Sequence, residues 1–123
     1  MDKTTALAAF SALAQETRLD ALRLLIGAGA EGLAAGQIAE ALGVRQNTLS
    51  NNLSILAAAS LVTSTRQGRS IRYRADLDGL EGMLEYLLQD CCGGNPALCR
   101  PAIAQIAATA AQSPAPQKLG PHS

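Results

Sequence analysis

The chain has 123 residues, of which 48% are hydrophobic and only 2% aromatic, and its formal net charge is zero. This length suits one domain, and a composition rich in Ala and Leu favours packed helices over a strand-rich sandwich. No apolar run reaches the ~18 residues that a membrane-spanning helix requires, so we expect no membrane partner.

The first segment, residues 6–14, is apolar and places its hydrophobic residues at helical spacing. Residues 12–14 read A-L-A, as a signal-peptidase site does. However, Asp2 cancels the charge of Lys3, and Ser11 interrupts the apolar stretch, so we expect a helix rather than an export signal. Without export the protein is expected in the cytoplasm, where cysteines remain thiols.

Three more helices are expected next. The first begins near residue 16 and ends at the glycines of positions 27 and 29. The second covers residues 34–42 and ends at Gly43, and the third covers residues 46–58.

A short β-hairpin is predicted after these helices. Residues 61–65 and 70–74 are rich in β-forming residues, and the expected turn between them, residues 66–69, contains a glycine. A stripe of leucines then predicts a fifth helix over residues 77–89.

The end of the chain has a different composition. Pro101 suits the first position of a sixth helix, expected to end near residue 111. Residues 113–123 hold three prolines and a glycine among polar residues, which is typical of a disordered tail. We therefore expect one domain over residues 1–112, mainly α-helical with one short β-hairpin.

The charges are unevenly distributed along the chain. Residues 45–75 contain five arginines and no acid, whereas residues 76–90 contain five acids and no base. Although the net charge is zero, residues 45–75 therefore form a basic block that can attract phosphates. A merely solvated face is the alternative explanation for such a block.

The predicted helices over residues 34–42 and 46–58 have the layout of a helix-turn-helix. Ala39 permits close approach and Gly43 supplies the turn. The second helix has leucines on one side and short hydrogen-bonding residues on the other, which are suited to base edges and phosphates in a major groove. An ordinary surface helix is the alternative, but this polar face lacks Lys and Glu. Together with the arginine-bearing hairpin, the pattern indicates DNA binding.

Three motifs occur in order. They are E-T-R-L-D-A-L-R-L-L at residues 16–25, Q-I-A-E-A-L-G-V-R-Q-N-T-L-S-N-N-L-S-I-L at 37–56, and L-V-T-S-T-R-Q-G-R-S-I-R-Y-R at 61–74. With them, residues 4–100 resemble the ArsR/SmtB family of metal- and metalloid-responsive bacterial repressors. The resemblance implies a winged helix-turn-helix of order α-α-α-α-β-β-α plus a C-terminal helix.

The resemblance also implies partners and site residues. The protein is expected to be a homodimer through its first and fifth helices, to bind double-stranded operator DNA, and to have no catalytic residues. Residues 46–58 would be the recognition helix and the hairpin the wing, with Arg69 at its tip reaching the DNA backbone or minor groove. One departure is Arg45, where relatives often place a capping Ser. The expected DNA-binding residues are Arg45, Gln46, Asn47, Ser50, Asn51, Arg66, Arg69 and Arg72.

The inducer sites best known in the resembled family are missing. The paired cysteines of its arsenic site in the third helix would fall at Ala34 and Gly36, and the single histidine, His122, cannot supply its zinc site. The remaining soft ligands are Cys91, Cys92 and Cys99, in the stretch D-C-C-G-G-N-P-A-L-C. Some arsenic-responsive relatives carry a cysteine pair and a third cysteine in this region.

Three thiolates suit trivalent arsenic or antimony, whereas zinc prefers four ligands. The Gly-Gly-Asn-Pro run is expected to end the helix after Cys92 and bring Cys99 back toward the pair. We therefore expect As(III) or Sb(III) as the inducer and no required cofactor. The same thiols also fit a redox switch or a cadmium or lead site, and buried packing is the alternative explanation for Cys91, although it does not account for Cys92 and Cys99. A metalloid carrier or an enzyme is a further alternative, disfavoured because no nucleophile–histidine arrangement is present.

Overall fold

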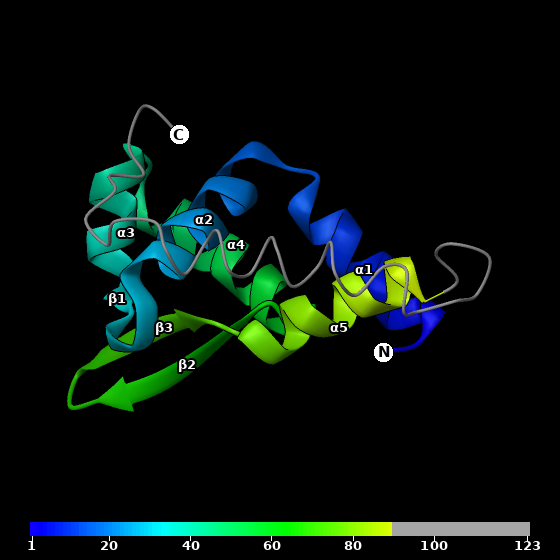
Figure 1. Cartoon of the computed structure of the whole chain (residues 1–123). Helices are drawn as coiled ribbons and strands as arrows, with labels where there is room; N and C mark the ends of the chain where they lie inside the picture. Colours follow the sequence, from blue (N-terminus) through cyan, green and yellow to red (C-terminus); the bar gives the residue numbers. More distant parts are fainter. Residues whose placement is uncertain (90–123) are drawn as a thin grey trace.

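The computed structural model describes residues 1–89, which form a helical domain with a small antiparallel sheet (Figure 1). The predicted sixth helix, the tail and all three cysteines lie outside these residues. The elements are α1 (Lys3–Leu13), α2 (Glu16–Ala28), the 3-10 turn η1 (Gly29–Glu31), β1 (Leu33–Ala34), α3 (Ala35–Leu42), α4 (Gln46–Ala58), β2 (Val62–Gln67), β3 (Ser70–Ala75) and α5 (Leu77–Leu88).

Both helices of the predicted helix-turn-helix end in the same way. After α3, Gly43 adopts a φ of 69°, and the N–H groups of Gly43 and Val44 donate to Glu40 and Ala39. This pair of bonds is the Schellman arrangement, which satisfies carbonyls that the helix end leaves free. The predicted bounds of α4 and the role of Gly43 are confirmed.

The end of α4 uses a serine where α3 uses a glycine. Ser60 has a φ of 65°, and the N–H groups of Ser60 and Leu61 donate to Ala57 and Leu56. Leu56 and Leu61 are both fully buried, as expected for the apolar contact that accompanies this motif. The chain therefore turns sharply from α4 into β2.

The sheet has one strand more than the predicted hairpin. Its order is β1-β3-β2, with Leu33 and Ala34 paired to Tyr73 and Arg72. The hairpin turn is also tighter than predicted, because Gln67 pairs with Ser70 and leaves a loop of two residues. A strand of two residues is too short to show an alternating pattern, so the sequence did not indicate β1.

The buried residues of α1 are all alanines, and Phe10 and Leu13 pack against the core only partly buried. Ala6, Ala9 and Ala12 are buried, whereas Leu7 is 60% exposed. Small side chains let α1 lie close to α2 and α4, with which it is in contact. The larger buried side chains come from elsewhere, chiefly Leu25, Ile38, Leu49, Leu53, Leu56 and Leu61.

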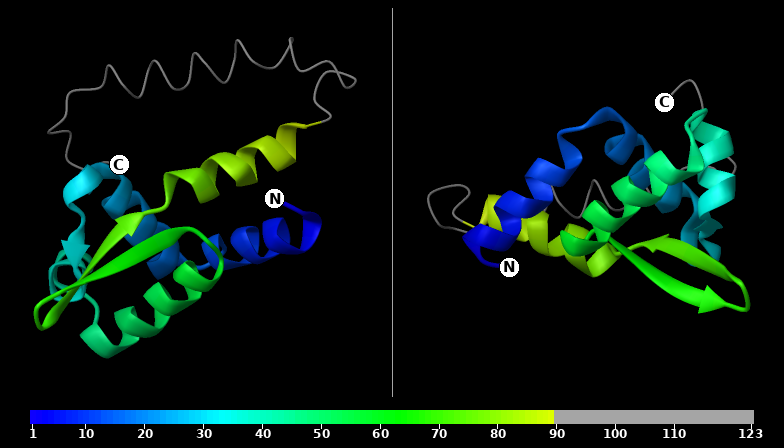
Figure 2. Two further views of the ribbon diagram at one scale, coloured as in Figure 1. Left: turned by 90° about the horizontal axis from the view of Figure 1, so that it is seen from below. Right: turned by 180° about the vertical axis from the view of Figure 1, so that it is seen from behind.

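The molecule has two well-separated ends. Helices α1 and α5 lie side by side at one end, and the β2–β3 hairpin projects from the other (Figures 1 and 2). Helix α5 is capped by Asp76, whose Oδ1 accepts a hydrogen bond of 3.0 Å from the Gly79 N–H. Among residues 1–89 no helix is long and apolar enough to cross a membrane.

Candidate nucleic-acid interface

The outward side of α4 carries uncharged polar side chains. Leu49, Leu53 and Leu56 are fully buried on the inner side. The exposed residues on α4 include all four that were predicted to face a groove, namely Gln46, Asn47, Ser50 and Asn51, together with Thr48 and Ser54. Amide and hydroxyl groups on one face of a helix can contact both base edges and phosphates.

The N-terminus of α4 has an unusual cap. Arg45 occupies the N-cap position and makes no capping hydrogen bond with its side chain. Instead, Asn47 Oδ1 accepts a hydrogen bond of 2.8 Å from the N–H of Thr48. This bond replaces the one that a capping Ser would make, and it leaves the Arg45 guanidinium exposed at the positive end of the helix dipole.

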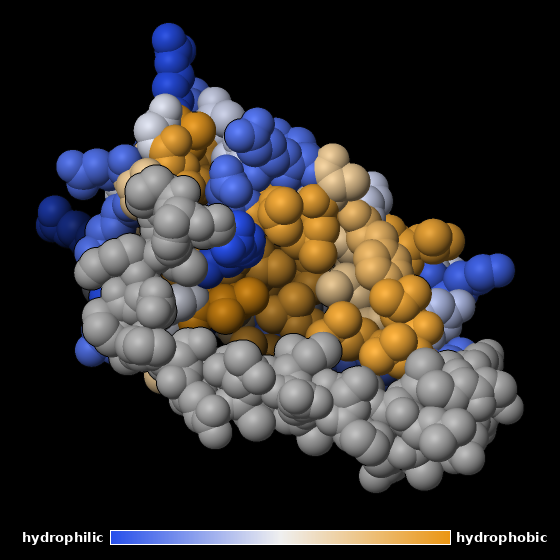
Figure 3. All heavy atoms as spheres, turned by 45° about the horizontal axis from the view of Figure 1, so that its top comes forward, coloured by the Kyte–Doolittle hydropathy of each residue, from blue (hydrophilic) through white to orange (hydrophobic). Residues whose placement is uncertain are grey.

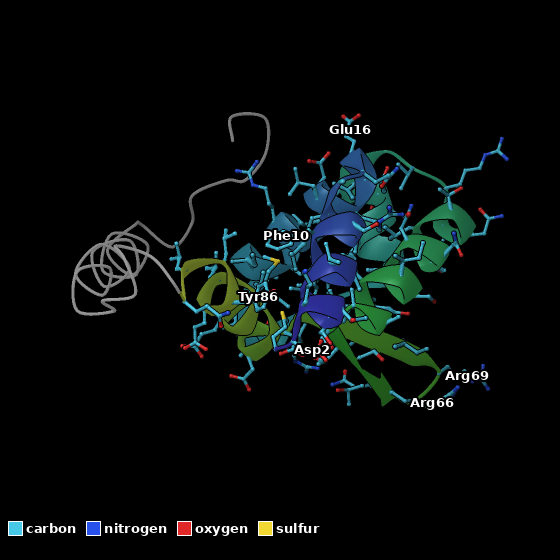
Figure 4. All side chains as sticks on the ribbon, turned by 90° about the vertical axis from the view of Figure 1, so that its right-hand side faces the viewer. Asp2, Phe10, Glu16, Arg66, Arg69 and Tyr86 are labelled. Atoms are coloured by element: carbon cyan, nitrogen blue, oxygen red, sulfur yellow. The ribbon has the colours of Figure 1, made fainter. Side chains whose placement is uncertain are left out.

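Two arginines lie at the tip of the hairpin. Arg66 is the next-to-last residue of β2, and Arg69 belongs to the two-residue loop. Both side chains are exposed, and they point away from the body of the molecule (Figure 4). Their guanidinium groups are therefore accessible to phosphates, as the predicted role of a wing requires.

The other two hairpin arginines are held at its base. Arg72 Nε donates to the carbonyl of Glu31 at 2.8 Å, and Arg74 Nε donates to the carbonyl of Ala30 at 2.7 Å. Arg74 also donates to Thr65 Oγ1 at 3.1 Å. These bonds tie β3 to the η1 turn, so Arg72, which was expected to bind DNA, contributes here to fixing the wing.

The arrangement thus brings together a polar helix face, one cation at the start of that helix and two cations at the wing tip. Within residues 1–89, no three His, Cys, Asp or Glu side chains are grouped in a way that can hold a metal ion. The predicted thiol site at Cys91, Cys92 and Cys99 lies outside the described part of the chain. Asn52, which is buried and hydrogen-bonded to Arg18, was not singled out from the sequence. The feature that could have indicated it is a polar residue on the leucine side of α4.

Known proteins with this arrangement are DNA-binding regulators. Residues 13–65 match the helix-turn-helix domain family. An ArsR-like transcriptional regulator from Rhodococcus sp. RHA1 is 32% identical with a TM-score of 0.62, covering 85% of this chain and 93% of its own. A homodimeric winged helix-turn-helix DNA-binding domain from Mycobacterium bovis, a possible ArsR-family regulator, is 30% identical with a TM-score of 0.58 over 70% and 84% of the two chains.

HlyU from Vibrio cholerae N16961 is 26% identical, with a TM-score of 0.58 over 75% of this chain and 99% of its own. No curated protein sequence matches the chain significantly. The agreement extends over most of the length of these relatives. The chain belongs to the ArsR family of winged helix-turn-helix transcriptional regulators, which bind DNA and are not enzymes.

Proposed function

We propose that this chain is a homodimeric transcriptional repressor that binds a palindromic operator through α4 and the wing. The observation that carries the proposal is the uncharged polar face of α4 beside exposed arginines at its N-terminus and at the wing tip. The arginines supply phosphate affinity that is independent of sequence, and the amides of α4 supply base recognition.

The exposed apolar side chains of α1 and α5 support a dimer. Leu77, Leu84 and Leu87 of α5 and Leu7 of α1 are between 49% and 64% exposed. Figure 3 shows hydrophobic atoms gathered into a broad band on one face of the molecule. Exposed apolar surface of this extent is typical of a protein–protein contact, and the Mycobacterium bovis relative is described as homodimeric.

A dimer through α1 and α5 leaves the proposed DNA face free. Phe10 and Tyr86 lie at the α1–α5 end, whereas Arg66 and Arg69 lie at the far tip of the hairpin (Figure 4). A two-fold symmetric dimer would present two copies of α4 to two half-sites, about 34–36 Å apart on one face of the duplex in proteins of this kind.

For the inducer we propose trivalent arsenic or antimony bound by Cys91, Cys92 and Cys99. These thiols follow α5 in the sequence, and α5 is one of the two helices proposed to form the dimer. A metalloid that binds one state of the dimer more tightly would shift the two α4 helices away from operator spacing. A coupling free energy of about 1–3 kcal/mol is typical of such linkage.

A redox-sensing repressor is the second candidate. It is favoured by the similarity to HlyU, one structure of which is described as reduced. Oxidation of two of the three cysteines to a disulfide would use the same segment without any metalloid. Both candidates share the fold and the DNA face, so they differ only in the signal.

The proposal is tested by fluorescence anisotropy with a labelled duplex that the protein itself selects from a random-sequence library. Arsenite, antimonite, cadmium and lead are titrated separately into the complex in a buffer that contains a reductant. Hydrogen peroxide is titrated in the same buffer without the reductant. Release of the duplex when arsenite is equimolar with the three-cysteine sites supports the metalloid proposal. Release by peroxide alone supports the redox candidate. Failure to bind any duplex in preference to random DNA would contradict the repressor proposal itself.

A further inference from the structure

Arg18, at the start of α2, joins three helices through one side chain. Its Nε donates to the carbonyl of Ala12 in the last turn of α1 at 2.6 Å, and its Nη1 donates to Asn52 Oδ1 of α4 at 3.0 Å. The Ala12 carbonyl is one that the end of α1 leaves without a helical partner, and a cation there is favoured by the helix dipole. The end of α1 and the middle of α4 are thereby connected through a single guanidinium group.

Asn52 is the one buried polar side chain among residues 1–89, with 6% of its surface exposed. Its Oδ1 accepts from Arg18, and its Nδ2 donates to the carbonyl of Thr48 at 3.2 Å. Asn52 lies between Thr48 and Leu56 on the inner half of α4, away from the exposed row of Asn47, Ser50 and Asn51. It therefore contacts the protein interior and is not available to DNA.

The hydrogen bond of Asn52 differs in kind from the apolar contacts beside it. Leu49, Leu53 and Leu56 bury the same side of α4, but apolar contact is non-directional and tolerates small rotations and tilts. A charge-assisted hydrogen bond depends on both distance and angle, so it defines an orientation. Replacing Asn52 by an apolar residue would leave the burial of α4 and remove this constraint.

The orientation of α4 matters on the scale of a single base pair. At ~1.5 Å per residue, its 13 residues form a rod about 20 Å long. A tilt of about 10° about its middle, where Asn52 lies, moves each end of such a rod by about 1.7 Å. Two-fold symmetry in a dimer would double this displacement between the two recognition helices to about 3.5 Å, which is close to the ~3.4 Å rise of one base pair.

We infer that Arg18 is a positioning residue, which through Asn52 fixes the tilt of α4 relative to α1 and so sets the half-site spacing that the dimer accepts. This inference rests on the proposed function, because α1 belongs to the proposed dimer contact and α4 to the proposed DNA face. The pair orients the recognition helix without touching DNA.

The test measures spacing preference and not affinity alone. The duplex selected by the wild-type protein is remade with its half-sites moved by −2, −1, +1 and +2 base pairs, and binding is measured by anisotropy alongside a scrambled duplex. The wild type is expected to prefer its own spacing over a one-base-pair shift by about tenfold or more. N52L, which removes the acceptor, is expected to reduce this preference to less than about threefold while binding scrambled DNA as the wild type does.

N52D is the matched control, because its carboxylate still accepts from Arg18 while the donor to Thr48 is lost. We expect N52D to keep the wild-type spacing preference. R18M, which keeps the aliphatic stem and removes the donors, should show the same reduced spacing preference as N52L. It serves as the test if N52L does not fold. The double variant R18M/N52L should reduce the spacing preference no further than either single variant does, as expected for two partners in one interaction.

Two failures are distinguishable. A wild-type protein that binds every spacing equally would overturn the dimeric docking on two half-sites, and the inference with it. A wild type with a sharp preference, together with a folded dimeric N52L or R18M that keeps that preference, would overturn the inference alone. Sedimentation velocity and circular dichroism of each variant establish that dimerisation and helix content are unchanged.

Discussion

Gly79 of α5 packs directly onto the main chain of Ser60, so closely that a methyl group at Gly79 would overlap the Ser60 carbonyl oxygen. The contact lies where the turn after α4 meets the first turn of α5. Because both contacting groups belong to the main chain, neither can move aside as a flexible side chain could. Gly79→Ala is therefore expected to destabilise the protein by about 1–3 kcal/mol or more, because α5 must shift away from this turn. Thermal unfolding at a fixed protein concentration measures the effect.

Gly82→Ala is the matched control, three residues further along the same helix. A Cβ at Gly82 would meet only the Met1 side chain at 3.6 Å, which is ordinary contact. Since alanine favours a helix interior over glycine by up to ~1 kcal/mol, this variant should be as stable as the wild type or more stable. Equal melting temperatures for the two variants would show that the Gly79 contact does not constrain α5.

The two Schellman turns predict effects of opposite sign. Ser60 has a φ of 65°, a region in which non-glycine residues are strained, so Ser60→Gly should stabilise the protein by about 0.5–1 kcal/mol. Gly43 has a φ of 69° with nothing within 4 Å of an added Cβ, so Gly43→Ala should cost about 1 kcal/mol from backbone strain alone. Chemical denaturation gives both values, and changes of the same sign would contradict this account of the turns.

The helices and the helix-turn-helix could be predicted because their signals are local. The glycine at position 43 and the leucine spacing of residues 46–58 determine a helix end and a buried face within a few residues of chain. The residues expected to face a groove are exposed on α4 for the same reason. The inducer was predicted from Cys91, Cys92 and Cys99, which lie outside the described part of the chain, and it stays a prediction.

The parts that could not be predicted depend on contacts between distant segments. Strand β1 exists because Leu33 and Ala34 pair with β3, some forty residues later. In the sequence Arg72 cannot be told apart from Arg69, because both are arginines of the predicted hairpin. In the fold, however, Arg72 Nε donates to the Glu31 carbonyl, and no pattern near Arg72 indicates that partner. Likewise the leucine stripe of residues 77–89 is regular, but only the fold shows that Leu77, Leu84 and Leu87 are exposed.

Arg69→Ala should weaken binding to every DNA sequence by a similar factor. Its side chain is exposed at the wing tip, and a contact with a backbone phosphate there would not depend on the base sequence. Loss of one such contact lowers the slope of log affinity against log salt concentration by about one. Lys3→Ala, which removes a cation from α1 at the opposite end of the molecule, is the control and should leave the slope unchanged. An unaltered slope in Arg69→Ala would exclude the wing tip from the interface.

Asn51→Ala should act on discrimination rather than on overall affinity. Asn51 is exposed in the middle of α4, and an amide can accept and donate at an adenine edge in the major groove. Its loss is expected to reduce the preference for the selected duplex over random DNA by about 1–3 kcal/mol, roughly 5- to 150-fold. Parallel titrations with both duplexes give this ratio. A ratio equal to that of the wild type would show that Asn51 does not read bases.

Cys91→Ser, Cys92→Ser and Cys99→Ser should each give a repressor that binds DNA but is not released by arsenite. The thiols and the proposed DNA-binding residues occupy separate stretches of the chain, residues 91–99 and 45–72, so operator affinity without inducer should equal that of the wild type. Serine keeps the size and polarity of cysteine but offers no thiolate at neutral pH, so a three-coordinate metalloid loses one of three strong bonds.

The three variants should differ toward an inducer that takes only two thiols. Cys91 and Cys92 remain in Cys99→Ser, so this variant is expected to respond to a methylated trivalent arsenical while it ignores arsenite. Operator release is measured by anisotropy for each variant with both compounds and with peroxide. Peroxide release in the wild type that disappears in the same variants would favour the redox candidate. Arsenite release at wild-type concentrations in all three variants would mean that these cysteines are not the inducer site, because no variant retains three thiols.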